Sequence, residues 1–129
     1  MKRTVITKIW FLVAFCYVAE GTLAFALQAK ATAADEIPKL AELMEWNPGT
    51  VVADIGAGDG SYTFAAVEQV GPTGKVFATE IDEEKLKALK AEVKKRDFKN
   101  VAVIESGEAE TNLPASCCDA IFCGASITI

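Results

Sequence analysis

The sequence predicts an α/β fold, a Rossmann-like parallel sheet with flanking helices. Short β-type runs alternate with helical segments from about residue 36 to residue 123, which implies parallel strands joined by crossover helices. A glycine-rich turn, Asp54 to Ser61, stands between the first strand and the next helix. Such a turn beside a helix N-terminus is typical of a nucleotide-binding site in this fold.

Each element is justified by periodicity and by the residues that flank it. The first helix has apolar residues on one face and ends at Asn47-Pro48-Gly49, and Gly71 closes the second. Asp82 is the expected N-cap of the third, most regular helix. The expected ranges are helix 36–46, strand 50–55, helix 61–70, strand 75–80, helix 82–98, strand 101–105 and strand 119–123. Because the chain reaches Ile129 just past the fourth strand, we expect a sheet truncated there.

The glycine spacing indicates which nucleotide the turn would hold. Gly56, Gly58 and Gly60 form G-x-G-x-G, and Ser61 occupies the place of the third glycine of the dinucleotide pattern G-x-G-x-x-G. The alternative is a tight turn with no ligand. With Asp54 two residues ahead of the first glycine, the segment resembles motif I of the class I S-adenosylmethionine-dependent methyltransferases.

That resemblance runs from about Asn47 to about Ala125 and implies S-adenosyl-L-methionine as the cofactor. It implies backbone contacts around Gly56, Ala57, Gly58 and Gly60, and ribose recognition by Glu80, which ends the second strand beside Ile81. Gly107 and Glu108, followed by Leu113-Pro114, match the family segment whose acidic residue contacts the adenine amino group.

Three other acidic residues near this site have expected roles of their own. Asp54 is expected to order the glycine loop or to reach the methionine amino group through water. Asp59 is expected to cap the following helix, and Asp82 is expected to cap a helix and not to bind ribose.

The resemblance implies an enzyme that transfers a methyl group to an acceptor that the sequence does not identify. No residue is named as catalytic, and the chain alone is expected to be inactive because the substrate half of the fold would follow the fourth strand. Two other classes stay open: an NAD(P)-dependent Rossmann oxidoreductase and a non-catalytic exported nucleotide-binding remnant.

Residues 1–29 are expected to be a separate leader, with the methyltransferase domain, partial, at residues 30–129. Lys2, Arg3 and Lys8 precede or flank an uncharged apolar run, and small residues follow it, as in a signal peptide. A membrane anchor, with membrane contact through residues 9–29, is the alternative, although Glu20 is costly in lipid. The domain would then be exported or membrane-anchored. The cofactor is made in the cytoplasm, so a cytoplasmic location stays open as well.

Composition and charge argue against several classes of function. The net charge of −5 gives no reason to expect nucleic-acid binding, and the absence of histidine excludes a Ser-His-Asp apparatus and histidine metal sites. The adjacent cysteines Cys117 and Cys118 lack the paired spacing of a zinc site, so no metal is expected. Free thiols are expected, with a bridge from either one to Cys123 as the alternative.

Overall fold

The computed structural model describes residues 31–124, so the predicted leader at residues 1–29 lies outside the described residues. The elements in chain order are α2 (Ala33–Leu43), β1 (Val51–Ile55), α3 (Ser61–Val70), β2 (Lys75–Glu80), α4 (Glu83–Lys95), β3 (Val101–Glu105) and β4 (Ala120–Phe122). Among the described residues, none of these helices has the length and apolarity needed to cross a membrane.

The four strands form one parallel sheet in the order β3-β2-β1-β4. Val52 of β1 lies opposite Val76 of β2 on one side and Ala120 of β4 on the other. The chain therefore moves outward from β1 to β3 and then returns to the other side of β1. This arrangement confirms the predicted Rossmann-like fold class and places the reversal of strand order between β1 and β4.

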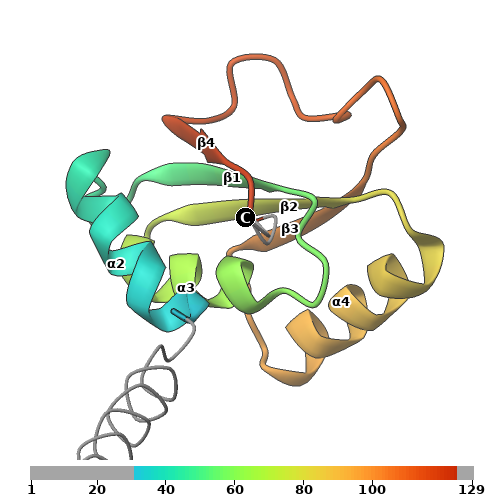
Figure 1. Ribbon diagram of the computed structural model, residues 1–129, viewed down its shortest axis with the longest axis horizontal. Coiled ribbons are helices and arrows are strands. Elements are labelled where there is room, and N and C mark those ends of the chain that lie inside the picture. Colours follow the sequence, from blue (N-terminus) through green and yellow to red (C-terminus); the bar gives the residue numbers. More distant parts are fainter. Residues whose placement is uncertain (1–30, 125–129) are drawn as a thin grey trace, which may run out of the picture. The chain divides into compact units, whose positions relative to one another are not determined.

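Helices cover one face of the sheet. Figure 1 shows α2, α3 and α4 on one side, and the segment at residues 106–119 on the other. α2 packs on α3, and α3 packs on β1 and β2. The larger buried apolar cluster lies between these elements and consists of Ile37, Ala41, Trp46, Val52, Ala66, Val67, Val70, Val76, Ala120 and Phe122.

The first helix begins earlier than the sequence predicted. The Asp35 carboxylate accepts hydrogen bonds from the Thr32 N–H and hydroxyl, which caps the helix there, and the two alanines at 33 and 34 form its first turn. The helix ends at Leu43, before the predicted Trp46, because Glu45 adopts φ 54°. This reversal lets the Trp46 N–H donate to Ala41 O and turns the indole into the core.

The other predicted elements agree with the structure, with differences only at their ends. α3, β2 and β3 have the predicted bounds, and Asp82 caps α4 by accepting a hydrogen bond from Lys85 N at 2.9 Å. α4 ends at Lys95, short of the predicted Phe98, because Asp97 adopts φ 56° and returns Phe98 to the core.

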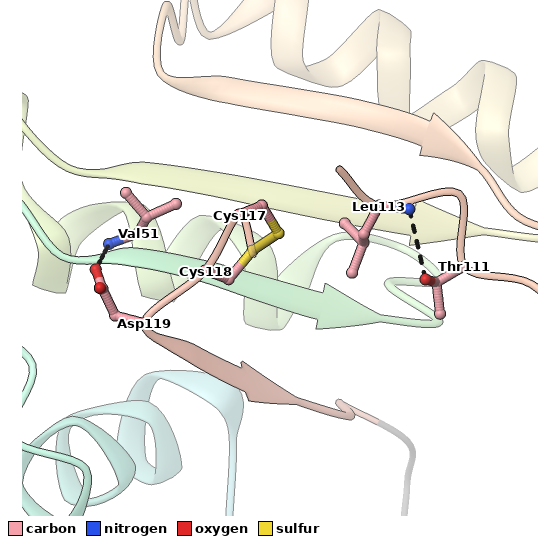
Figure 2. Close-up of a disulfide and its surroundings, with 6 residues drawn as sticks. All are labelled: Val51, Thr111, Leu113, Cys117, Cys118 and Asp119. Carbon is pink, nitrogen blue, oxygen red and sulfur yellow. Dashed lines mark hydrogen bonds between the residues drawn. A yellow bond between two sulfur atoms is a disulfide. The ribbon is translucent and has the colours of Figure 1, made fainter. Parts of the chain in front are cut away.

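Side chains fix the amino ends of the strands, at the sheet edge away from the glycine loop. The Asp119 carboxylate accepts a hydrogen bond from Val51 N at 2.8 Å, just before β4 begins (Figure 2). The Asn100 amide donates to Gly71 O at 3.0 Å and to Gly74 O at 3.2 Å. Asp119 thus lies at the edge of the sheet remote from the glycine loop.

The cysteines differ from the expectation. Cys117 and Cys118 form a disulfide with each other, so neither the expected free thiols nor the alternative bridge to Cys123 is present (Figure 2). A turn brings the adjacent cysteines together: Cys117 N donates to Pro114 O, and Ser116 adopts φ 54°. The Cys123 thiol is free and exposed.

Candidate functional site

The glycine loop follows β1 and requires glycine for two different reasons. Gly56, Gly58 and Gly60 have φ values of 72°, 58° and 82°, in the left-handed region that other residues rarely adopt. At Gly60 an added Cβ would also lie 2.6 Å from Leu89 Cδ1 and 2.7 Å from Phe64 Cε2. At Gly56 and Gly58 the space is open, the nearest atom being Gly56 O, 4.0 Å from a Cβ at Gly58. A ligand can therefore approach the backbone at Gly56 and Gly58.

The N–H groups of this loop already donate to acceptors within the protein. The five pairs are Gly56 N to Thr79 Oγ1 at 3.3 Å, Ala57 N to Thr79 O at 2.8 Å, Gly58 N to Glu80 Oε2 at 2.7 Å, Gly60 N to Ala57 O at 2.9 Å and Ser61 N to Asp59 Oδ1 at 2.9 Å. Most of these bonds fasten the loop to the carboxyl end of β2. The loop is therefore held in shape without a ligand.

Glu80 is the central residue of this arrangement. Its side chain is buried, and while Oε2 accepts from the loop, Oε1 accepts from Ile81 N and Asp82 N at 2.9 Å each. Burial by itself would raise the pKa of Glu80, but these three N–H donors outweigh it and the pKa lies below its usual value. The carboxylate is therefore ionised at neutral pH and ties the glycine loop to the start of α4.

Asp54 has partners other than those predicted. It is fully buried, its Oδ2 accepts from the Thr63 hydroxyl at 2.7 Å, and its Oδ1 accepts from Gly124 N at 3.4 Å. Burial raises the pKa of Asp54; the bonds from Thr63 and Gly124 oppose this rise, and the charges of Glu80 and Asp59 add to it. Asp54 thus joins β1 to α3 and to the chain after β4, and these hydrogen bonds go to the segments on either side of the glycine loop's own contacts with β2.

Asp59 plays the local role that the sequence indicated. Its carboxylate accepts from Ser61 N, and this hydrogen bond is the main reason that the pKa of Asp59 is lowered. Gly60 is the N-cap residue of α3, and it has no side chain that could cap the helix. Asp59 therefore caps the helix from one position further upstream.

The segment assigned to adenine begins beside Glu80. Glu105 of β3 lies opposite Glu80 in the sheet, and Ser106 N donates to Glu80 O at 3.0 Å. Gly107 and Glu108 follow in an exposed loop in which Gly107 N donates to Glu110 O at 2.8 Å. Ile81, at the same edge of the sheet, is 53 % exposed. The structure therefore gathers the predicted residues along the carboxyl ends of β1, β2 and β3.

Three side chains in this region were missed by the sequence reasoning. Thr79 and Thr63 are buried and hold the glycine loop and Asp54, respectively. The Tyr62 hydroxyl donates to Glu36, which ties α3 to α2. The only signal for Thr79 was a hydroxyl in an otherwise apolar strand. Within residues 31–124 no group of acidic or cysteine side chains could hold a metal ion.

A parallel sheet with a glycine loop after its first strand and a buried acid at the end of its second defines a Rossmann-like nucleotide-binding domain. Comparison with known families identifies this class of protein more narrowly. A family model described as a methyltransferase domain matches residues 47–127, well over half of the chain. The chain belongs to this methyltransferase family.

Individual relatives agree with this membership. Nocamycin O-methyltransferase of Saccharothrix syringae is 32 % identical over 91 residues, 70 % of this chain and 32 % of the relative. The crystal structure of a SAM-dependent methyltransferase from Aquifex aeolicus superposes with a TM-score of 0.62 at 33 % identity, over 67 % of this chain and 46 % of that one. Ribosomal RNA large subunit methyltransferase E of Nitrosomonas eutropha is 49 % identical over 47 residues, 33 % of this chain and 23 % of the relative.

The chain spans less than half the length of these relatives. The matches support S-adenosylmethionine as the cofactor and do not favour a nicotinamide-dependent oxidoreductase.

Proposed function

We propose that the described domain binds S-adenosylmethionine and serves an enzyme that transfers its methyl group to an acceptor. The main observation in favour of this cofactor is that the amides of the glycine loop donate to acceptors within the protein. One of these acceptors is the buried carboxylate of Glu80.

The state of these amides argues against a dinucleotide. A pyrophosphate needs free N–H donors at the glycine turn, and carboxylates at the turn would repel it. Here five loop amides are already bonded, and Asp54 and Asp59 lie at the turn. A ligand without phosphates, which carries an ammonium and a sulfonium group, is compatible with both features.

The residues present fit the adenosine part of this cofactor. Glu80 has one acceptor site left beyond its three backbone bonds, so it can also accept from a ribose hydroxyl. Ile81 offers an exposed apolar side chain to the adenine ring, and Glu108 offers a carboxylate to the adenine amino group. The open backbone at Gly56, Ala57 and Gly58 accommodates the chain between ribose and methionine.

When bound, the cofactor supplies an activated methyl group, and the protein's contribution is to hold donor and acceptor in line. Asp119 lies at the opposite edge of the sheet, so it does not act as a base here. The named relatives act on different acceptors. The negative net charge gives no support to a nucleic-acid acceptor. The basic and apolar residues at 2–29 support export or membrane attachment as a further proposal.

The test is calorimetric titration of the full chain with S-adenosylhomocysteine and with NAD, using the variants Gly58→Ala and Gly71→Ala. Both glycines have positive φ, 58° and 67°, and at neither would a Cβ clash with a neighbour. Both variants therefore suffer backbone strain, but only Gly58 lies in the loop.

We expect S-adenosylhomocysteine to bind the native chain and Gly71→Ala, NAD not to bind, and Gly58→Ala to lose most of its affinity. Equal binding to both variants would remove the glycine loop from the site. Binding of NAD in preference would overturn the proposed cofactor.

A further inference from the structure

Cys117 and Cys118 are joined by a disulfide that cannot act as a staple of the fold. The two cysteines are adjacent in the sequence, so the bond closes a small ring around the single peptide that links them. A disulfide restricts the unfolded chain more strongly when the segment that it closes is longer, and this one has no residue between its cysteines. Its effect is therefore confined to the local conformation that the ring fixes.

The segment that carries the disulfide has few bonds to the rest of the domain. It crosses the face of the sheet opposite the helices (Figure 1). Leu113 N donates to the Thr111 hydroxyl (Figure 2), and Cys117 N donates to Pro114 O at 3.3 Å. Within the described part of the chain, the hydrogen bonds of residues 113–118 are all of this local kind. The conformation of this segment therefore depends on the ring and on the bonds at its two ends.

Directly after the disulfide the chain is fastened to β1. Asp119 N donates to Val51 O, and the Asp119 carboxylate accepts from Val51 N, each at 2.8 Å (Figure 2). β4 follows and is only three residues long, so these two bonds are a large part of what holds it to the sheet. Because Cys118 immediately precedes Asp119, the ring sets the direction in which the chain enters β4.

The disulfide is also within reach of a reductant. Both cysteines are half-buried, and the residues on either side of them, Ser116 and Asp119, are exposed. Thiol–disulfide exchange requires that a thiolate reach one of the two sulfur atoms, and accessible disulfides are the labile ones. The thiols left by reduction stay side by side in the chain, so the bond can close again without ordering a distant segment.

We propose that Cys117 and Cys118 form a reversible thiol–disulfide exchange site for a dithiol reductant, and that the oxidised pair fixes the entry of the chain into β4. One thiolate of the reductant attacks a protein sulfur, the S–S bond breaks, and the other protein sulfur leaves as a thiolate and takes up a proton. The second thiol of the reductant then displaces the first protein sulfur from the mixed disulfide. The protein gains two electrons and two protons, and the dithiol is oxidised to its own disulfide.

Reduction should loosen this end of the sheet and leave the domain folded. Once the ring is open, the peptide between the cysteines is no longer restrained, and Ser116, with φ 54°, is free to leave the left-handed region. The bonds between Asp119 and Val51 should then open more often. α4 lies on the other face of the sheet (Figure 1) and should not respond.

The first measurement places the full chain in glutathione buffers of increasing reduced fraction. After equilibration the free thiols are alkylated, and peptide mapping separates the pair from Cys16 and Cys123. We expect the pair to pass from oxidised to reduced within the range that glutathione sets, whereas structural disulfides resist reduction by glutathione.

The second measurement is hydrogen–deuterium exchange on the oxidised chain and on the chain reduced with dithiothreitol. Amides of residues 117–124 should exchange severalfold faster after reduction, and those of α4 should be unchanged. Tm should be nearly the same in both states, because opening a ring between neighbours releases no long loop.

Variants locate the effect. The double variant Cys117→Ser, Cys118→Ser should exchange as fast as the reduced native chain and should not respond to the reductant. Cys123→Ser is the matched control, because it removes an exposed thiol just past the carboxyl end of β4, and it should keep the full response.

If the double variant does not fold, the two measurements on the native chain still decide. A pair that stays oxidised until the protein unfolds, or a chain that unfolds on reduction, would identify a structural crosslink and overturn the proposal. Equal exchange of residues 117–124 in the two states would overturn the link between the pair and β4.

Discussion

Replacing Glu80 by alanine removes one carboxylate and three hydrogen bonds, from Gly58 N, Ile81 N and Asp82 N. Hydrogen bonds to a charged group contribute about 1.5 kcal/mol each at the low end, so the three together contribute about 4–5 kcal/mol. Water can replace part of these bonds in the variant, because Ile81 at this edge of the sheet is 53 % exposed, and this reduces the loss to about half. We therefore expect Glu80→Ala to lower the free energy of unfolding of the ligand-free domain by about 2–3 kcal/mol.

Thermal unfolding followed by circular dichroism, without any ligand, measures this loss. For a domain of this size, 2–3 kcal/mol corresponds to a fall in Tm of about 10–20 °C. Glu84→Ala is the matched control, because it removes an exposed acid from the first turn of α4, which follows Glu80, and it should change Tm by only a few degrees. Glu80→Gln should lie between the two, since its amide group would face the Gly58 N–H and lose that bond.

The pH dependence of stability tests the role of Glu80 in a second way. The pKa of Glu80 is lower in the folded protein, so its stabilisation is present above the ordinary glutamate pKa and is lost as pH falls through the lowered value. The difference in Tm between the native chain and Glu80→Ala should therefore shrink in acid. If Glu80→Ala melted within about 2 °C of the native chain at neutral pH, a threshold well below the expected shift, the carboxylate would not hold the loop.

Two further predictions concern packing and the cysteines. Gly60→Ala should destabilise the domain more than Gly56→Ala in chemical denaturation, because only at Gly60 does an added Cβ meet Leu89 and Phe64 at 2.6–2.8 Å; equal losses would contradict this packing. Under native, non-reducing conditions, alkylation and peptide mapping should label Cys123 and leave Cys117 and Cys118 unlabelled until a dithiol is added, and prior labelling of either would contradict the disulfide.

The local elements could be predicted from the sequence because their signals are local. Glycines at alternate positions after an apolar run, and an acid at the end of the next run, placed the loop and Glu80 correctly. The N-cap at Asp82 was predicted for the same reason.

What could not be predicted depends on contacts between distant segments. Asp54 finds Thr63 on a helix and Gly124 some 70 residues away, and neither partner is marked in the sequence. The early start of α2 depends on a cap at Thr32, ahead of the apolar periodicity from which the helix was predicted. The pairing of Cys117 with Cys118 depends on a turn that only the folded loop defines.

Asn100 has a consequence for how this domain can be changed. Its amide donates to two carbonyl oxygens in the turn between α3 and β2, so aspartate there would set a carboxylate against two acceptors and only a donor side chain is tolerated. With Asp119, it holds the sheet at the edge remote from the glycine loop. Substitutions at Asn100 or Asp119 should therefore alter stability without touching the residues proposed to contact the ligand.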